Sequence, residues 1–572
     1  MSPAAEPPIT PSPADHFWKV SLLLLTFLLG CFDLSNGDIW WHLRTGQLIW
    51  ERGEVPQTDW FTFTNPSAPW TDLHWGFQLA AVALWGVGGS AALILAKSFL
   101  GSATFAFCLS LRSKALPSWL LVGLWVPSLL IFAGRYYVRP EVVSLLLLAA
   151  TLWIFSRAEE KPRYLWFLPL LQLIWVNVQG LFVLQFVVMA CFGIDFFATA
   201  RQAERATAYI PTKTLIASYV TTLMASLANP YGVQGTLLPY TLFQRVSGPH
   251  RAFYRRYSAE FRGTGEFISE FGLGAFQDLT ILLLACLFTA CCGTFAWLFL
   301  RRALRLYRLL LFMAFTYLTW QMSRNSVLFA IVAGAILTAN ISDITALVQT
   351  NSRESNRSNL PQILRWFVAA LLAGFMISLP TGIYHQTRRA AIRRHFGFGE
   401  AAWFGHDAAK FLSQAGMPKH IYATHEGQAA VCLYHLGPEK RIFVDARLET
   451  HTRETLQRYL QIRNQIATFD PAVIDNLTRE ITPDATGKRE IPAIVVDNNT
   501  LLLFSARQPG FLTNLTQGLW RCVYSDTHGP VDRQMFWHIR NGTSVFLTRE
   551  KTAELDLPTA DLSAITSLLS PR

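Results

Sequence analysis

Acidic and imidazole side chains that could do chemistry follow the first apolar segment of the chain. Asp38 comes directly after an Asn-Gly turn, where it suits the N-cap of a helix over residues 39–52. Asp38, His42 and Thr45 are spaced i, i+4, i+7, so they share one face of that helix. A carboxylate beside an imidazole can remove a proton from a hydroxyl group or help to hold a divalent metal ion. A simple cap that favours the helix dipole is an equally good interpretation of Asp38.

Two further candidates lie in the same stretch. Asp59 is a second carboxylate, in a compact turn where it can equally well cap the backbone. His74 and Gln78 are spaced i, i+4 on the next predicted helix. We therefore predict Asp38, His42 and Asp59 as candidate catalytic residues and His74 as a further site residue. No cofactor is certain, and a divalent metal at Asp38 is an open alternative.

Arginines occupy unusual places near the ends of apolar segments. Arg135 and Arg139 flank a turn between two such segments, and Arg324 lies between two others. A charge at bilayer depth costs about 2.5–3.5 kcal/mol, so such a side chain usually faces a cavity or a partner. The guanidinium fork suits a phosphate group, and snorkelling to the membrane surface is the plain alternative. Glu141 and Glu270 are carboxylates that can pair with these arginines.

A long loop at residues 229–275 carries a second group of basic side chains, with tyrosines between them: His250, Arg251, Arg255, Arg256 and Arg262. This patch can bind a lipid phosphate or an anionic glycan. The alternative is a solvated helix face that contacts anionic headgroups. The predicted ligands of a donor phosphate are Arg135, Arg139, Arg324, Arg255 and Arg256.

The amino-acid composition indicates that membrane-spanning helices hold these candidate residues in place. The 572 residues are 51% hydrophobic and 15% charged, against roughly 25% charged residues in soluble domains. Because the apolar residues form long runs, we predict a polytopic membrane protein, which excludes an ordinary soluble enzyme and a disordered chain. The net charge of +11 arises largely from Lys and Arg in short loops, as in membrane proteins, and indicates no nucleic-acid partner.

Eleven apolar segments are candidates for membrane spans, which need about 20 apolar residues each. They are 17–32, 89–111, 117–134, 140–157, 163–178, 180–198, 212–228, 276–300, 306–321, 325–347 and 363–383. Glycines at 86, 88 and 89 separate residues 73–85 from the next span and predict a surface or re-entrant helix there. The helix over 39–52 holds three tryptophans and suits the membrane surface. The predicted fold class is mainly α, a polytopic helical protein with about eleven spans.

Basic loops alternate with these spans if the N-terminus is inside. They contain Arg112 and Lys114; Arg157, Lys161 and Arg163; Arg201, Arg205 and Lys213; Arg301, Arg302, Arg305 and Arg308; and Arg353 and Arg357. Residues 1–16 are rich in proline and predicted to be disordered. The predicted transmembrane domain then covers 17–384, with long outer loops at 33–88 and 229–275.

Residues 385–572 are predicted to form a soluble α/β domain outside the membrane. Strands are expected at 442–444, 491–496, 521–524 and 544–547, and helices at 407–415 and 452–466. The charged residues Asp445, Arg447, Glu449 and Asp497 follow strands. Carboxylates there are sometimes catalytic and more often cap loops. Cys432 and Cys522 can form one disulfide in an oxidising compartment.

The stretch that begins with D-I-W-W-H-L-R-T-G-Q-L-I and continues with V-P-Q-T-D-W-F-T-F-T and H-W resembles a large bacterial group of membrane proteins. This group is related to class C glycosyltransferases, which use polyprenyl-phosphate-sugar donors. Further landmarks of the group are Arg139-Pro140-Glu141, Trp175-Val176-Asn177, Asn229-Pro230-Tyr231-Gly232, Ile268-Ser269-Glu270, Ser323-Arg324-Asn325 and the VDARLE strand. The likeness extends from about residue 17 to residue 550 and adds Glu141, Asn177, Glu270 and Asn325 as site candidates.

The resemblance implies a first outer loop with an essential acidic residue, whose position Asp38 matches, and an active site that faces the outside. It implies an enzyme of the bacterial cytoplasmic (inner) membrane, with the N-terminus in the cytoplasm and the C-terminal domain outside. Such an enzyme moves a hexose or pentose from a polyprenyl-phosphate donor to a glycan, lipid or protein acceptor, among membrane lipids. Asp38 would be the general base, His42 would support it, and the arginines would hold the phosphate. The alternatives are a polymerase or ligase of lipid-linked glycans, a transporter, and a non-catalytic scaffold.

Overall fold

The computed structural model describes residues 13–111, 116–200, 210–351, 360–387, 394–508, 510–526 and 542–562. Among the residues named above, Arg112, Lys114, Arg201, Arg205, Arg353 and Arg357 lie outside the described residues, as do residues 1–12 of the predicted disordered segment. The chain forms two compact units. The helical unit consists of Met1–Asp33 and Ser90–Phe398, and the mixed unit consists of Leu34–Gly89 and Gly399–Arg572.

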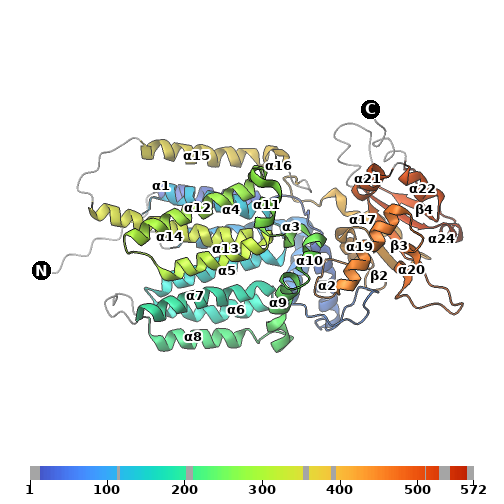
Figure 1. Cartoon of the computed structure of the whole chain (residues 1–572), viewed down its shortest axis with the longest axis horizontal. Helices are drawn as coiled ribbons and strands as arrows, with labels where there is room; N and C mark the ends of the chain where they lie inside the picture. The colour runs from blue at the N-terminus through green and yellow to red at the C-terminus, as the bar shows by residue number, and fades with distance from the viewer. Residues whose placement is uncertain are drawn as a thin grey trace. The chain divides into compact units, whose positions relative to one another are not determined.

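The helical unit is built from apolar helices, most of which run side by side in Figure 1. They are α1 (Pro13–Gly30), the part of α3 (Trp75–Leu109) after Gly89, α4 (Ser118–Gly134), α5 (Pro140–Ala158), α6 (Phe167–Val176), α7 (Val183–Ala200), α8 (Thr212–Ala225), α12 (Leu279–Leu300), α13 (Leu306–Gln321), α14 (Ser326–Asn351) and α15 (Leu360–Ser378). The short elements η1 (Pro162–Trp166), η2 (Gly180–Phe182) and α16 (Ile383–Thr387) connect or follow them. Each predicted apolar segment coincides with one of these helices, because a helix satisfies its own backbone hydrogen bonds inside a membrane.

Five helices of the described residues are long and apolar enough to cross a membrane: Trp75–Leu109, Pro140–Ala158, Gly180–Ala198, Leu279–Leu300 and Ser323–Gln349. Ser118–Gly134 and Gln362–Ser378 are shorter apolar helices. The chain is thus a mainly helical, multi-pass membrane protein, and the count of eleven spans stays a prediction.

The predicted outer loop 229–275 is folded into short helices. These are α9 (Gly232–Ser247), α10 (Arg251–Tyr257), η3 (Ala259–Phe261), α11 (Thr264–Phe271) and η4 (Gly272–Gln277). In Figure 1, α9, α10 and α11 lie at one end of the helical bundle. The element η5 (Ser323–Asn325) lies at the same end, because the backbone N–H of Ser323 donates to the carbonyl of Arg262 over 2.8 Å.

The mixed unit contains a five-stranded sheet in the order β2-β1-β3-β5-β4. Its strands are β1 (His420–Ala423), β2 (Arg441–Ile442), β3 (Ala493–Asp497), β4 (Trp520–Ser525) and β5 (Thr543–Thr548). β1 pairs in parallel with β2 and β3, which places Ile421 opposite Ile442 and Ala493, whereas β5 runs antiparallel to β3 and β4. Four of these strands overlap the predicted runs, and β1 is the one that the sequence pattern does not predict.

Helices surround this sheet and complete the α/β domain. They are η6 (Ala402–Phe404), α17 (His406–Leu412), α18 (Glu426–Leu436), α19 (Arg453–Thr468), α20 (Val473–Thr478), α21 (Asn498–Arg507), α22 (Phe511–Gln517) and α24 (Arg549–Glu554). α17 and α19 overlap the two helices expected from the sequence at 407–415 and 452–466. Asp497 accepts a hydrogen bond from the Thr500 N–H over 2.9 Å and so caps α21, which is the plainer of its two predicted roles.

The first outer loop is part of the mixed unit, whereas the sequence assigns it to the transmembrane domain. Its helix α2 (Asp38–Arg52) packs on α18, and its residues 61–64 lie along the edge strand β2. The Ile442 N–H donates to the Phe61 carbonyl over 2.9 Å, and the Phe63 N–H donates to the Ile442 carbonyl over 3.2 Å. The loop therefore covers backbone groups that an open sheet edge would leave unpaired.

Glycines occupy two positions of this loop, one where two helices come into close backbone contact and one where the backbone leaves helical geometry. A Cβ atom on Gly37 would lie 2.7 Å from the Cα of Gly427, so the starts of α2 and α18 touch backbone to backbone. α3 loses helical geometry at Gly88 and at Gly89, whose φ of 56° favours glycine. This break lies between the two helices that the sequence separates, and it is also the boundary between the two units.

Two expectations about the mixed unit are wrong. Trp40 and Trp41 are 1% and 5% exposed and therefore cannot lie on a membrane surface, because the Trp40 ring packs on Phe404 and His406 at centroid distances of 5.2 and 4.3 Å. Trp50, the third tryptophan of this helix, is 73% exposed. Cys432 and Cys522 do not form a disulfide: both are buried free thiols, and burial raises the pKa of each to about 12.

Candidate functional site

Arg135, predicted from the sequence, lies where α4 ends and is held by a carboxylate of the next helix. Its Nε and Nη2 atoms donate to the two carboxylate oxygens of Glu141, over 3.3 and 3.2 Å. Arg139 is the N-cap residue of α5, with Pro140 as the first helical residue. Pro suits that position because it has no N–H to satisfy there. The turn between the two helices thus presents two guanidinium groups at the same end of the bundle.

Glu260 of η3 reaches these arginines, although the sequence does not single it out. Its Oε1 atom lies 3.3 Å from Nη1 of Arg135 and 3.6 Å from Nη1 of Arg139. Burial alone would raise the pKa of Glu260, and the charges of Arg135, Arg139 and Arg324 outweigh burial and hold that pKa far below its ordinary value. One carboxylate is therefore shared among the three arginines that the sequence predicts as phosphate ligands.

The segment that carries Arg324 is anchored to this cluster by its neighbours. The guanidinium of Arg324 lies 6.0 Å from the centre of the Phe261 ring, next to Glu260. The Asn325 side chain donates to the Leu318 carbonyl over 2.9 Å and so ties η5 to the end of α13. Asn177 has a similar task elsewhere: its amide donates to the carbonyls of Leu173 and Ala228, over 2.8 Å each. Both side chains thus bind backbone carbonyls and hold the ends of their helices in place.

Arg255 and Arg256, the other two predicted phosphate ligands, belong to a different group of charges. Together with Arg251 and Arg262 they line an open hollow formed by α10, η3 and α11. Arg255 pairs with Glu266, and Arg262 pairs with Glu270. No ion pair among the described residues brings Arg255 or Arg256 to Glu260.

In the mixed unit, Asp38 is half-buried at the first helical position of α2. The prediction that it is the N-cap is wrong by one residue, because Gly37 is the cap and the Asn36 side chain accepts the Asp38 N–H over 3.2 Å. The charge of Asp38 acts on the imidazoles of His74 and His425. The carboxylate thus acts on one imidazole from its own loop and one that precedes α18, and its predicted pairing with His42 stays a prediction.

His42 and Thr45, which share a face of α2 with Asp38, are both buried. The His42 ring contacts the rings of Trp41 and His74, at centroid distances of 3.6 and 5.4 Å. The Thr45 hydroxyl donates to the Trp41 carbonyl within the helix, over 2.8 Å. These contacts link His42 to the other imidazole of the loop through packed rings.

His74 is an imidazole that lies beside a buried carboxylate. Its Nδ1 atom lies 3.3 Å from Oδ1 of the buried Asp72. Burial lowers the pKa of His74, and the hydrogen bond and charge of Asp72, with smaller contributions from Glu449 and Asp38, raise it above its ordinary value. Burial has the opposite sign for an acid and raises the pKa of Glu449, against the charge of His74. The carboxylates thus favour the protonated form of the His74 imidazole, and groups perturbed in this way are candidates for a functional site.

His425 is a second imidazole on which Asp38 acts, and its pKa is shifted in the direction opposite to that of His74. It precedes α18, where its Nδ1 atom accepts the Gly427 N–H over 3.0 Å. Burial lowers its pKa, and the charges of Asp497 and Asp38 only partly offset burial. Burial thus favours the neutral form of the His425 imidazole. An N-cap pattern, His-Glu-Gly after a strand, is the one signal by which the sequence could have pointed to it.

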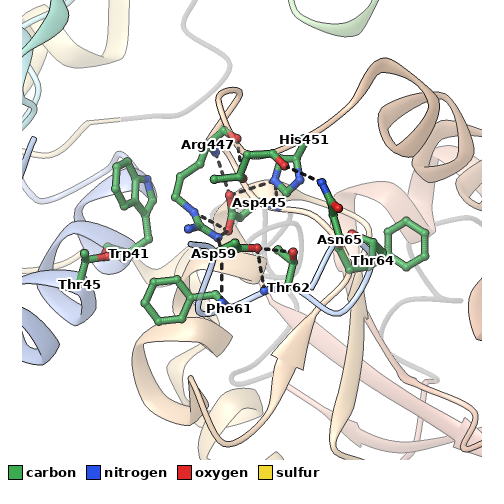
Figure 2. Close-up of polar contacts among 12 residues, drawn as sticks. Trp41, Thr45, Asp59, Phe61, Thr62, Thr64, Asn65, Asp445, Arg447 and His451 are labelled. Carbon is green, nitrogen blue, oxygen red and sulfur yellow. Dashed lines mark hydrogen bonds and ion pairs between the residues drawn. The ribbon is translucent and has the colours of Figure 1, made fainter. Parts of the chain in front are cut away.

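Asp59 is in a buried ion cluster, shown in Figure 2. Its Oδ1 atom lies 2.7 Å from Nη2 of Arg447, and its oxygens accept the backbone N–H groups of Phe61 and Thr62 over 3.1 and 3.2 Å. The same guanidinium donates to Asp445 through Nε and Nη2, over 2.9 and 2.5 Å. All three charged side chains are fully buried.

This buried ion cluster is better suited to stabilising the fold than to transferring a proton. Arg447 is 4.3 Å from the centre of the Trp70 ring, and His451 lies 3.2 Å from Asp445. Burial would raise the pKa of Asp445, and the charge of Arg447 outweighs it and keeps Asp445 ionised. The cluster therefore ties the turn of the first outer loop to the segment after β2.

The alternative of a divalent metal at Asp38 finds no support in the arrangement of side chains. A bound metal needs several ligating groups that converge on one point. Among the described residues, no group of three or more His, Cys, Asp or Glu side chains is placed in that way.

The arrangement of apolar helices, helical outer loop and α/β domain is the fold of class C glycosyltransferases, which confirms the fold expected from the sequence. One similar structure is the apo form of the Archaeoglobus fulgidus oligosaccharyltransferase. It is 12% identical in sequence, with a TM-score of 0.52, over 90% of this chain and 74% of that chain. Another is ArnT from Cupriavidus metallidurans bound to undecaprenyl phosphate, 10% identical with a TM-score of 0.46 over 94% of this chain and 98% of that chain. Neither a protein-family model nor a curated protein matches the chain.

Proposed function

We propose that this protein transfers a sugar from a polyprenyl-phosphate donor to an acceptor at the outer face of the cytoplasmic membrane. The observation that carries the proposal is the gathering of Arg135, Arg139 and Arg324 about one carboxylate, at one end of a membrane-embedded bundle. Arginines at such a place are costly unless they face a charged partner. Their forked donors match the oxygens of a phosphate group.

In the proposed sugar transfer, Asp38 and the group of three arginines have different roles. An acceptor hydroxyl oxygen forms a bond to C1 of the sugar, and the bond between C1 and the phosphate oxygen breaks. The hydroxyl proton passes to the carboxylate of Asp38. Arg135, Arg139 and Arg324 stabilise the negative charge that grows on the departing polyprenyl phosphate. The sugar is a hexose or a pentose, and the mixed unit contributes to binding of a glycan, lipid or protein acceptor.

Glu260 is the counter-charge of the arginines when no donor is bound. Glu260 lies within reach of Arg135 and Arg139, and the charges of all three arginines act on it. A donor phosphate that binds these arginines takes the place of Glu260. Replacing Glu260 with Gln is therefore expected to strengthen the binding of undecaprenyl phosphate, whereas Arg139→Gln weakens it.

The test of the proposed base uses the full chain in lipid nanodiscs and a panel of undecaprenyl-phosphate-linked hexoses and pentoses. Release of undecaprenyl phosphate is measured with time. Asp38→Asn should lower the turnover rate by about 10²–10⁴-fold, the usual contribution of a general base. Donor binding should stay close to that of the wild type, because Asp38 is not assigned to the phosphate.

Asp475→Asn is the matched control, since Asp475 is an exposed aspartate of the same unit. Full activity of Asp38→Asn would overturn the assignment of the base. If the wild type leaves every donor of the panel intact and a deletion strain accumulates pyrophosphate-linked glycans, the protein is a polymerase or ligase and the proposed donor class is wrong.

A further inference from the structure

The open hollow beside η3 has a composition that the proposed transfer does not explain. It has a volume of about 590 Å³ and is lined by the side chains of Arg251, Arg255, Arg256, Arg262 and Glu266 together with two alanines. A single phosphate bound at Arg135 would use none of these side chains. The hollow is therefore a candidate for a second, separate binding site.

Among the residues that the structure describes, no carboxylate is paired with two of the four arginines in the hollow. Glu266 pairs with Arg255, and Glu270 pairs with Arg262. Arg251 and Arg256 are exposed on α10, and no carboxylate in residues 210–351 pairs with either of them. Burial, followed by the nearby charge of Arg251, lowers the pKa of Arg255, which shows that the positive charges crowd one another. An anion from outside the chain would relieve this repulsion.

Exposed apolar side chains accompany the hollow on the neighbouring elements. Phe271 and Leu273, at the end of α11 and in η4, are 56% and 88% exposed. Val233, Leu237 and Tyr240 of α9 are also exposed and follow one another at i, i+4, i+7. The apolar span α12 begins at Leu279, only a few residues after η4. A basic hollow with apolar flanks and a span next to it is the setting of a membrane surface.

We propose that this hollow binds the phosphate-bearing headgroup of an anionic membrane lipid, with Arg251 and Arg256 as the principal ligands. A free phosphate ion or a soluble anionic glycan would gain nothing from the apolar flanks, whereas the acyl chains of a lipid would lie along them. The site is separate from the Glu260 cluster, whose arginines already hold carboxylates. The proposal does not depend on sugar transfer, because it concerns affinity for a bilayer component.

The test measures lipid binding to the purified full chain by native mass spectrometry. The probes are phosphatidylglycerol and phosphatidylcholine of equal chain length, and inorganic phosphate. Arg251→Gln/Arg256→Gln is the test variant, and Arg301→Gln/Arg302→Gln is the matched control, since Arg301 and Arg302 are an exposed pair between α12 and α13. Each arginine near an anionic headgroup is worth about 1 kcal/mol, so the test variant should bind phosphatidylglycerol about 10–30-fold more weakly.

The expected pattern has three parts. The wild type and the control prefer phosphatidylglycerol to phosphatidylcholine, the test variant loses that preference, and added salt weakens the preference of the wild type. The proposal is overturned if the test variant keeps the preference, or if the control loses it equally, because the effect would then be one of net charge. It is also overturned if millimolar inorganic phosphate displaces the lipid completely, since the hollow would then be a site for a free anion. An unchanged unfolding temperature shows that the variants are folded.

Discussion

Arg447 is a single side chain that holds two distant parts of the sequence in one unit. Its guanidinium contacts Asp59 in the first outer loop and Asp445 after β2, and none of the three side chains is exposed. Neither partner is paired with a second guanidinium among the ion pairs of the described residues. Removal of the arginine would therefore leave two buried carboxylates facing each other.

We expect Arg447→Met to destabilise the mixed unit by about 3–5 kcal/mol, the range for breaking a buried ion pair by removal of one partner. Chemical unfolding of the full chain, followed by tryptophan fluorescence, measures the loss. Arg441→Met, at the exposed end of β2 in the same unit, should change the stability by less than about 0.5 kcal/mol. Equal effects of both substitutions would contradict the role given to Arg447.

The same residues show what the sequence alone could predict at this scale. Asp38, Arg135, Arg139 and Arg324 stand out because their types are unusual next to apolar runs. The pairing of such residues does not follow from the sequence, since Glu260 and Arg447 come from segments distant from their partners and meet them only when the chain folds back. Residue type predicts which charges need a partner, and only the tertiary structure shows which partner they have.

The contact between α2 and α18 depends on two glycines. Gly37 has φ and ψ values of −67° and −20°, which any residue adopts, so space and not backbone conformation requires glycine there. We expect Gly37→Ala to cost about 1–3 kcal/mol, as other overpacking substitutions do. Thermal unfolding monitors the change. Gly86→Ala is the control: a Cβ at this helical position meets nothing within 4 Å, and the substitution should be neutral or stabilising by up to about 1 kcal/mol.

A pair of histidines joins α17 to α18 and makes the mixed unit sensitive to acid. Nδ1 of His406 and Nε2 of His435 are 2.9 Å apart, and burial, together with the charge of His406, lowers the pKa of His435 from 6.5 to about 4. Between these values the unfolded chain binds a proton that the folded chain does not. Stability is therefore full above pH 6.5 and falls as the pH decreases toward 4.

Unfolding temperatures measured between pH 7.5 and pH 4.5 test this expectation. The wild type should lose stability across the window set by the pKa of His435, and His435→Asn should lose less, because it removes one titrating group. Parallel pH profiles of the two proteins would exclude His435 as a cause of the acid sensitivity.

Helices could be predicted from the sequence where the apolar pattern of one continuous segment is enough to define them. The apolar runs of the helical unit predict its helices because each run is long enough to form one by itself. Trp40 and Trp41 mislead for the opposite reason: an amphipathic helix rich in tryptophan suits a membrane surface and a protein core equally well. Which of the two covers the helix is decided by α18 and η6, almost 400 residues later in the chain.

At the scale of the whole molecule, the charges of the loops predict an orientation. Lys161 lies in a basic loop that should face the cytoplasm, whereas Gly248 lies in the long loop that should face outside. Alkaline phosphatase needs disulfides and is active only outside the cytoplasm. Fusions after Gly248 should be active, and fusions after Lys161 should be inactive. The reverse pattern would invert the orientation, and with it the assignment of the Asp38 and arginine clusters to the outer face.

The division of the chain between its units has a consequence for biosynthesis. The mixed unit is built from Leu34–Gly89 and Gly399–Arg572, with most of the helical unit encoded between them. At a synthesis rate of about 5–20 residues per second, the ribosome needs roughly 15–60 seconds to make the intervening stretch of about 300 residues. During that time Asp59 has no Arg447, and the strip at 61–64 has no β2 to lie against. The early segment must stay unaggregated until the last third of the protein arrives, so chaperones and the rate of membrane insertion are expected to limit the yield of active protein.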